Sequence, residues 1–302
     1  MSSTSALAPP TFGAYLYGWY DPPKWKAHRH PHAPLIGYYN SNDPLAVRWQ
    51  VEQIQRTGID YVVFEMVPVD DISFRQCLSH ADQFIDAATR VGIGYSFLID
   101  FATMPVGCDV VKEYDAILAE LAHRDWLRSV VDIPGHGRSI FGFAPFPDLV
   151  PAIQARTPDG LKPYWAIWNP DWDLINPASH DPAVAALLQR QWKPAVERGI
   201  RYADSIEPLG YIQFWQKTEQ TLALNGFAAV CPGYDDLLLQ RQPQLADVLP
   251  RRDGLTLVEQ FQAATASGAP NILIYSWNEY FESAGIEPTI EFGDFYQNSP
   301  GI

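Results

Sequence analysis

Two glutamates near the end of the chain, Glu279 and Glu282, are the residues most suited to chemistry. They are three positions apart, so both would lie on one face if this segment turned helical. Neighbouring carboxylates raise each other's proton affinity, which lets one hold a proton while the other stays ionised. Glycoside hydrolysis needs that division, because one carboxyl protonates the leaving oxygen and the other acts on the sugar. Two exposed glutamates at the start of a solvated helix would explain the spacing equally well.

The elements that must position these residues form an alternating series of strands and helices. We expect strands at 13–20, 59–67, 94–100, 139–145, 164–168, 210–215, 227–231 and 271–277, and helices at 44–57, 73–91, 112–128, 182–198 and 256–267. The first of these helices has Asp43 as its expected N-cap and Gly58 at its end, and Ser73 is a possible cap of the second. Since no linker separates these elements, the sequence predicts an α/β fold, a (β/α)8 TIM barrel that forms a single domain over residues 1–302. Residues 1–11 are expected to form an extended or disordered tail.

The active site of such a barrel lies at the C-terminal ends of its strands. That position is expected for acidic, aromatic and amide side chains from five strands: Trp19, Tyr20, Asp21, Glu65, Asp100, Tyr234, Asp235, Asp236, Asn278, Glu279 and Glu282. The sequence thus brings side chains from distant segments to one edge of the sheet. Asp100 could bind sugar hydroxyls or cap a helix or loop.

The charge and the aromatic content narrow the class of partner. The chain of 302 residues has 21 Lys and Arg against 35 Asp and Glu, which gives a formal net charge of −14. Nucleic acids and anionic membranes need a basic face, so we expect neither as a partner. No apolar run approaches the length of a membrane-spanning helix. The 10 Trp and the 13% aromatic content favour neutral, hydroxylated ligands such as sugars.

The cysteines and the N-terminus predict neither a metal cofactor nor a secretion signal. Cys77, Cys108 and Cys231 are far apart and form no Cys-x-x-Cys pair, so we expect no disulfide framework and no zinc site. The first residues lack the basic and apolar regions of a secretory signal. We therefore expect a cytoplasmic protein, or a secreted, phage-associated or surface-associated one if a signal has been trimmed.

Three stretches resemble glycoside hydrolase family 99 and the family-99-like proteins of bacterial polysaccharide clusters. Residues 276–282 read S-W-N-E-Y-F-E, with G-I-E-P at 285–288 and G-D-F-Y at 293–296, and are similar to the family's S-W-N-E-W-H-E-x-x-x-I-E-P. Residues 37–44, G-Y-Y-N-S-N-D-P, with T-G-I-D at 57–60, resemble the family's first loop, helix and second strand. Residues 231–236, C-P-G-Y-D-D, resemble its strand-seven S-P-G-Y-D-D.

The resemblance implies a retaining, endo-acting α-mannosidase or α-mannanase that uses no metal. It implies that Glu279 acts as a base on the substrate's own 2-hydroxyl, which attacks the anomeric carbon to give a 1,2-anhydro sugar. Glu282 would protonate the leaving oxygen and later activate the water that opens this intermediate. The expected substrate-binding residues are Trp19, Tyr20, Glu65, Tyr234, Asp235, Trp277 and Asn278. The expected partner is an oligosaccharide or polysaccharide, and no cofactor is expected.

The sequence departs from the family pattern at two places beside the expected site. Tyr280 and Phe281 stand where the family usually has Trp and His, which removes a polar contact. The second expected strand ends in Phe64-Glu65-Met66 where a Ser-Trp pair is common, which adds a carboxylate near the mouth of the barrel. Both catalytic glutamates remain, so the pattern favours retained catalysis and leaves specificity for α-mannose open.

Two alternatives to a glycosidase remain open from the sequence. One is a non-catalytic or glycosyltransferase-associated carbohydrate-binding barrel of a polysaccharide cluster, although no phosphate-binding glycine loop is visible. The other is a metal-dependent amidohydrolase-like barrel, with a metal held by His28, His30 and Asp100. His28, His30 and His32 lie in a Pro-rich stretch, and a loop at the lip of the cleft is the simpler interpretation of them.

Overall fold

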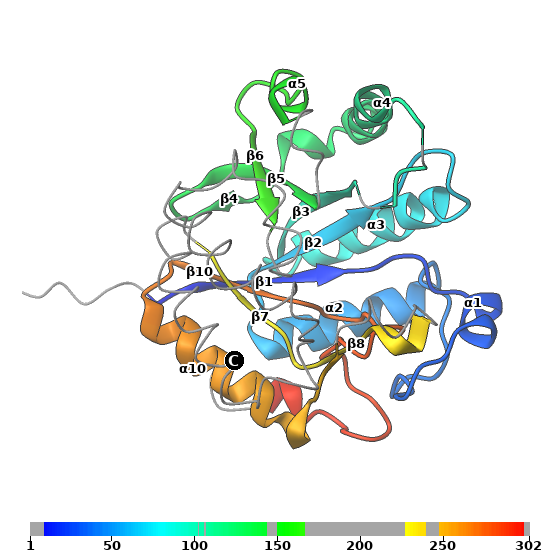
Figure 1. The fold of residues 1–302 in the computed structure, drawn as a ribbon, viewed down its shortest axis with the longest axis vertical. Coiled ribbons are helices and arrows are strands. Elements are labelled where there is room, and N and C mark those ends of the chain that lie inside the picture. Colours follow the sequence, from blue (N-terminus) through cyan, green and yellow to red (C-terminus); the bar gives the residue numbers. More distant parts are fainter. Residues whose placement is uncertain are drawn as a thin grey trace, which may run out of the picture.

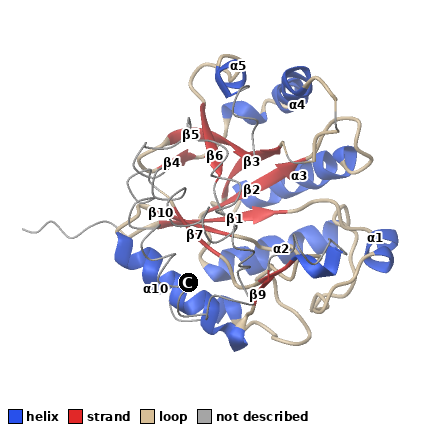
Figure 2. Ribbon diagram, viewed as in Figure 1, coloured by secondary structure: helices blue, strands red, loops and turns tan. Residues whose placement is uncertain are grey.

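A mostly parallel sheet with helices on its outer side forms the molecule (Figures 1 and 2). The computed structural model describes residues 9–101, 103–105, 107–143, 150–166, 227–239 and 248–298. The strands of this sheet are β1 (Thr11–Leu16), β2 (Tyr61–Met66), β3 (Gly94–Asp100), β4 (Asp132–Ile133), β5 (Gly137–Phe143), β6 (Lys162–Ala166), β7 (Ala228–Val230) and β10 (Asn271–Ile274). A separate two-stranded sheet pairs β8 (Tyr234–Asp235) with β9 (Val248–Leu249).

The order of the parallel strands follows the expected barrel order. Starting from β6, the neighbours are β5, β3, β2, β1, β10 and β7, and only the short β4 pairs antiparallel, with β5. Strands β6 and β7 stand at the two ends of this series and bracket residues 167–226. The strand expected at 210–215 and the helix expected at 182–198 both lie outside the described residues. The mixed α/β sheet is therefore confirmed for the described part of the chain.

The helices are α1 (Pro22–Ala27), α2 (Pro44–Thr57), α3 (Phe74–Thr89), α4 (Val110–His123), α5 (Val150–Gln154) and α10 (Leu255–Ser267). The expected ends of α2 are confirmed, because the Asp43 side chain accepts a hydrogen bond from the Leu45 N–H and Gly58 has φ of 78°. The expected cap of α3 is wrong, since the Ser73 side chain makes no cap hydrogen bond and instead accepts one from Lys24 Nζ at 2.8 Å.

Alternation along the strands divides the core into an outer and an inner layer. Val62, Phe64 and Met66 of β2 belong to the cluster that packs against the helices. Tyr61 and Val63 belong to a second cluster inside the sheet. Because successive side chains of a strand point to opposite faces, Glu65 faces the same inner side as Tyr61 and Val63. The same alternation places Asp100 on the inner side of β3.

Several boundaries differ from the sequence prediction. Strand β1 already includes Thr11, which was expected in the tail, and it ends at Leu16 rather than at residue 20. The segment 276–287 forms turns instead of a helix, so helical spacing does not bring the two glutamates together. Among the described residues, no helix is long and apolar enough to cross a membrane.

Candidate active site

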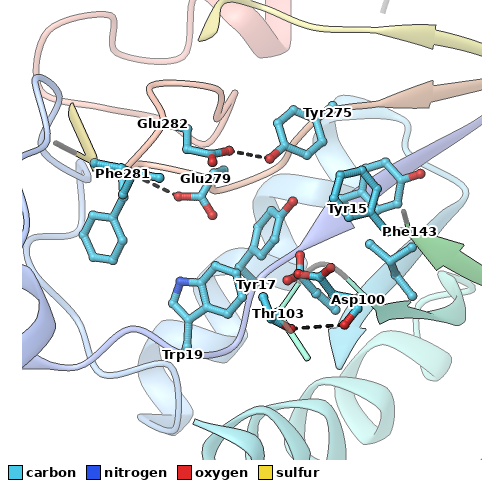
Figure 3. Close-up of a pocket in the computed structure, with 13 residues that line it drawn as sticks. Tyr15, Tyr17, Trp19, Asp100, Thr103, Phe143, Tyr275, Glu279, Phe281 and Glu282 are labelled. Carbon is cyan, nitrogen blue, oxygen red and sulfur yellow. Dashed lines mark hydrogen bonds between the residues drawn. The ribbon is translucent and has the colours of Figure 1, made fainter. Parts of the chain in front are cut away.

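A pocket of about 390 Å³ opens at the C-terminal edge of the parallel sheet (Figure 3). Its described walls carry aromatic rings and carboxyl groups from β1, β2, β3, β5 and the segment after β10. The lining residues are Tyr15, Tyr17, Trp19, Glu65, Leu98, Asp100, Thr103, Phe143, Leu239, Tyr275, Glu279, Phe281 and Glu282. Within this set of lining residues there is no lysine, arginine or histidine.

The two glutamates of the family-99-like motif are brought into the pocket by a compact turn. The Ser276 hydroxyl accepts the Glu279 N–H at 2.7 Å, and the Ala284 N–H donates to the Glu279 carbonyl at 2.8 Å. On the far side of the turn, the guanidinium of Arg251 donates to the carbonyl oxygens of Ser283 and Gly285 at 2.7 and 2.8 Å. These bonds fix the backbone that carries both carboxyl groups.

Glu279 is only 3% exposed, and one of its oxygens is held by the backbone. Its Oε1 accepts the Phe281 N–H at 2.9 Å and lies 3.3 Å from the Tyr20 hydroxyl, which donates more closely to the Asn278 carbonyl at 2.6 Å. Figure 3 shows the other carboxyl oxygen directed toward the cavity. Burial, followed by the charge of Glu282, raises the pKa of the Glu279 carboxyl well above its usual range.

Glu282 is held by two tyrosine hydroxyls, one on each oxygen. Tyr234 donates to Oε1 at 3.0 Å and Tyr275 donates to Oε2 at 2.6 Å. Tyr234 belongs to the hairpin strand β8, whose next residue, Asp235, donates its N–H to the Glu282 carbonyl at 2.7 Å. The hairpin and the segment after β10 therefore fix both the side chain and the backbone of Glu282.

Glu65 and Asp100 form a second carboxyl pair on the facing wall. Glu65 is the penultimate residue of β2 and Asp100 is the last residue of the adjacent parallel strand β3, and they are 6% and 5% exposed. Burial, and then the charge of Asp100, raises the pKa of the Glu65 carboxyl well above its usual range, and the two side chains share a hydrogen bond. Figure 3 shows Asp100 across from Glu279 and Glu282, with Tyr17 between them.

A buried glutamate outside the pocket ties the turn that carries Glu279 and Glu282 to the rest of the fold. Glu287 is 1% exposed and accepts four hydrogen bonds. The donors are Tyr280 at 2.7 Å, Tyr39 at 2.9 Å, Gln50 of α2 at 2.9 Å and Trp277 at 3.1 Å. Burial raises the pKa of the Glu287 carboxyl to about 7, although these donors act in the opposite direction.

The structure divides the expected site residues into two groups. Trp19, Glu65, Glu279 and Glu282 line the pocket together. The others lie behind its wall: Tyr20 and Trp277 are fully buried, Asn278 bonds to the Tyr17 backbone through both its amide atoms, Tyr234 supports Glu282, and the Asp235 carboxyl accepts the Leu237 N–H. These residues can hold the reacting groups, whereas Trp19 and Glu65 can touch a ligand.

Sequence reasoning did not name Tyr15, Tyr17, Tyr275 and Phe281 as site residues, although all four line the pocket. The signal was present in the alternation of β1, since Tyr15 and Tyr17 are two residues apart and must share the inner face. Tyr275 directly follows β10, and it is two residues after Leu273, so the same alternation puts both on the inner face.

The residues proposed for an amidohydrolase-like metal site do not come together. His28 and His30 lie in the loop after α1, where their rings contact Phe281, whereas Asp100 lies beside Glu65 inside the pocket. In the part of the chain that the structure describes, no group of three His, Cys, Asp or Glu side chains is arranged to hold a metal ion.

These features define an α/β protein with a carboxyl-lined pocket at the C-terminal edge of a parallel sheet. No protein-family model and no curated protein sequence matches the chain. Several solved structures match it in fold. The family-99 endo-α-mannosidase of Bacteroides thetaiotaomicron in complex with bis-tris propane is 16% identical, covers 95% of this chain and 94% of its own, and has a TM-score of 0.65.

Two further structures give the same result. A second structure of the Bacteroides thetaiotaomicron family-99 endo-α-mannosidase has 16% identity, the same coverage of 95% and 94%, and a TM-score of 0.63. A glycoside hydrolase-like protein has 13% identity, covers 98% of this chain and 95% of its own, and has a TM-score of 0.64. In structure as in sequence, the chain resembles glycoside hydrolase family 99, and at these identities the likeness establishes the fold.

Proposed function

We propose that the protein is a glycoside hydrolase that cleaves an α-glycosidic bond in a mannose-containing or related glycan, with retention of configuration. The observation that carries this proposal is the pair Glu279 and Glu282, two buried carboxyls that face one cavity and have different partners. The likeness to family-99 glycoside hydrolases supports it. We further infer that the sheet closes into a (β/α)8 barrel.

Glu282 is proposed as the general acid and then the general base. As the acid it gives its proton to the leaving oxygen, and the hydroxyls of Tyr234 and Tyr275 stabilise the carboxylate that remains. In the second step this carboxylate takes a proton from the attacking water. Glu282 is thereby protonated again, as it was before the turnover.

Glu279 is proposed as the base on the 2-hydroxyl of the bound sugar. The Phe281 N–H orients the carboxyl group through one oxygen, and the oxygen directed toward the cavity takes the hydroxyl proton while O2 attacks the anomeric carbon. A carboxylate whose pKa is raised by burial is the stronger base, which suits this role. When water opens the 1,2-anhydro sugar, Glu279 returns the proton to O2.

The remaining lining residues suit a hydroxylated ligand. Tyr17, Trp19 and Phe143 offer ring faces, and Glu65 and Asp100 offer acceptors for sugar hydroxyls. Glu65 adds a carboxylate at a strand end where the family commonly has a Ser-Trp pair. The proposed substrate is therefore an α-mannoside or a related glycan with a hydroxyl that Glu65 can bind.

The test is reducing-end release from a panel of α-linked glycans by wild type, Glu279→Gln and Glu282→Gln. Removal of a general acid or base costs about 10²- to 10⁴-fold, so both variants should fall by that amount. Activity that survives both substitutions would place the chemistry elsewhere. Binding of the glycans by wild type without any product would favour the non-catalytic carbohydrate-binding alternative.

The role of the 2-hydroxyl has its own test. A 2-deoxy analogue of a cleaved glycan has no oxygen with which to form the 1,2-anhydro sugar, so it should not be hydrolysed. Efficient turnover of that analogue would rule out Glu279 as a base on O2, while the assignment of Glu282 as acid/base would still stand.

A further inference from the structure

The described lining of the pocket carries acidic groups and no basic ones. Four of its residues are carboxylic acids, and none of the described lining residues is a lysine, an arginine or a histidine. The whole chain is also acidic, with a formal net charge of −14. A cavity lined by one sign of charge concentrates ligands of the opposite sign. The pocket therefore attracts cations and repels anions.

The acid pair on the facing wall, Glu65 and Asp100, is the part of this lining that most needs a positive charge. In the pairing of β2 with β3, Glu65 lies opposite Leu98, so Asp100 is two residues further along β3 and faces the same side. The two side chains are buried and share a hydrogen bond. Buried charges in proteins are normally paired with an opposite charge, and the described lining of the pocket supplies none. A positively charged ligand can supply it.

Aromatic rings in the same pocket are a second feature that favours a cation. Tyr17 and Trp19 both line the cavity, and their ring centroids lie 4.6 Å apart. Figure 3 shows Tyr17 between Asp100 and the two glutamates of the opposite wall. The faces of tryptophan and tyrosine rings attract an ammonium group, and the attraction grows where water is excluded. The rings and the acid pair therefore favour the same kind of ligand through two separate interactions.

A protonated amine fits both the acid pair and the proposed reaction. An ammonium group has three N–H donors, so it can donate to Glu65 and Asp100 together, whereas a hydroxyl group has one donor. Its positive charge also stabilises the ionised form of the carboxyl groups that it contacts. Loss of its hydration on entering the pocket limits the net gain. Because Glu279 is proposed to act on the 2-hydroxyl, the amine must be on another carbon of the sugar.

We propose that Glu65 and Asp100 make the pocket selective for an amino sugar, which has a free 2-hydroxyl and a protonated amine at C3, C4 or C6. This inference rests on the proposed function and narrows it, since it names a class of sugar within the glycans that the enzyme is proposed to cleave. A neutral sugar can place a hydroxyl against the same acid pair. It then gains a hydrogen bond without the attraction between opposite charges, so it binds more weakly.

The experiment measures binding by calorimetric titration at about pH 7, where a primary amine is mostly protonated. The ligands are methyl α-mannoside and its 3-amino-3-deoxy, 4-amino-4-deoxy and 6-amino-6-deoxy derivatives, in each of which an amine of nearly equal size replaces one hydroxyl. At least one amine should bind to wild type about tenfold more tightly than methyl α-mannoside. The N-acetyl derivative of that amine has no charge and should lose this advantage.

Amide variants test whether the acid pair is the group that binds the amine. Glu65→Gln and Asp100→Asn each leave one carboxyl group, which can ionise alone, so each variant should keep part of the preference for the amine. The double variant Glu65→Gln/Asp100→Asn should bind the amine and methyl α-mannoside equally. Glu52→Gln changes an exposed glutamate of α2 and should keep the full wild-type preference. Circular dichroism checks that each variant is folded.

The outcomes separate this selectivity from the catalytic proposal, because the titrations require no hydrolysis. The selectivity is overturned if wild type binds none of the amines more tightly than methyl α-mannoside, or if the N-acetyl derivative keeps the advantage. Both results come from wild type, so they hold even if the double variant does not fold. A folded double variant that keeps the full preference would overturn the role of Glu65 and Asp100. The proposed function fails separately, if no α-linked glycan is cleaved.

Discussion

The two walls of the pocket carry the same kind of side chain in different surroundings. On the wall after β10, each glutamate is held by donors: Glu282 by two tyrosine hydroxyls and Glu279 by a backbone N–H. On the facing wall, Glu65 is hydrogen-bonded to another acid, Asp100. All four are nearly buried. The walls therefore differ in partners rather than in burial.

The different partners give the carboxyl groups different properties: those on the wall after β10 are held in a fixed orientation, and those on the facing wall share a proton. Donors stabilise the ionised carboxylate and fix its direction. A fixed direction is needed in a group that gives a proton to, or takes one from, a single atom of the substrate. Two acids in contact cannot both ionise easily, so the pair on the facing wall holds a proton between them. We infer that the first wall carries the chemistry and that the second recognises hydroxyl groups.

The largest expected effect is a different response of the Glu279→Gln and Glu282→Gln variants to the leaving group of the substrate. With a sugar leaving group, Glu282→Gln should lower kcat/KM by about 10²- to 10⁴-fold. With an acidic phenol as leaving group, which departs without protonation, the loss for Glu282→Gln should be much smaller. Glu279→Gln should lose activity equally with both, because attack by O2 is needed in each case.

The measurement is kcat/KM for the two substrates with wild type and each variant. Circular dichroism of the variants checks that they are folded. If Glu279→Gln, and not Glu282→Gln, were rescued by the phenol, the two roles would have to be exchanged. If neither were rescued, Glu282 would not be the proton donor to the leaving group.

The second prediction concerns Glu287, which supports the first wall from behind. Its pKa rises from 4.5 to about 7 on folding, so the folded state holds a proton that the unfolded state has lost. Stability therefore falls as pH rises from about 4.5 through about 7, by ~3 kcal/mol from this group. The free energy of unfolding of Glu287→Gln should therefore fall less than that of wild type between about pH 4 and about pH 8, and urea unfolding at the two pH values measures this difference.

A matched control for Glu287 is Glu52→Gln, which changes an exposed glutamate on the outside of α2. It should keep the wild-type loss of stability between the two pH values. An unchanged pH dependence in Glu287→Gln would mean that this carboxyl has the same pKa in the folded and the unfolded state, so that its four donors offset its burial.

Two of the pocket-lining acids, Glu65 and Asp100, could be placed from the sequence because strand geometry alone determines their position. Glu65 and Asp100 end buried runs of strand length, and the period of two puts each on the inner face. The same local physics predicted α2, whose cap Asp43 and terminal Gly58 depend only on neighbouring residues. Where a rule is local and the element regular, the sequence was sufficient.

The side chains beyond the strand ends could not be placed in this way. Tyr20, Trp277 and Asn278 are close in sequence to pocket residues, yet the structure turns them into the protein, where Tyr39, Glu287 and the Tyr17 backbone receive them. Those partners are distant in sequence, and no periodicity applies in a turn. The direction of a side chain there depends on tertiary contacts.

A smaller effect is expected from the tyrosines that distinguish the first wall. Tyr275→Phe removes the hydroxyl that donates to Glu282 at 2.6 Å, so the ionised form of Glu282 loses a stabilising partner. We expect kcat/KM to fall about tenfold, which corresponds to one hydrogen bond to a charged group. The limb of the pH–rate profile that depends on Glu282 should move to higher pH.

The control for Tyr275 is Tyr95→Phe. Tyr95 lies on the outer layer, and its hydroxyl donates to the Trp126 carbonyl at 3.0 Å, so its loss should lower stability without moving the pH–rate profile. A profile that stays in place for Tyr275→Phe would show that this hydroxyl does not tune Glu282, and Tyr234 would then be the tyrosine that remains to stabilise the ionised Glu282.

The smallest expected effect is on the facing wall, where Glu65→Gln replaces an acid that is costly to ionise. The raised pKa of Glu65 means that its folded form holds a proton, so wild-type stability falls as pH rises above the ordinary glutamate value. The amide has no such charge, and the variant should be more stable than wild type by about 1 kcal/mol at pH 8, with the difference vanishing near pH 4. Urea unfolding measures this, and the KM for the cleaved glycan should rise if Glu65 binds a hydroxyl. A variant less stable than wild type at pH 8 would mean that donors stabilise Glu65 as they do Glu282, and the two walls would then be alike.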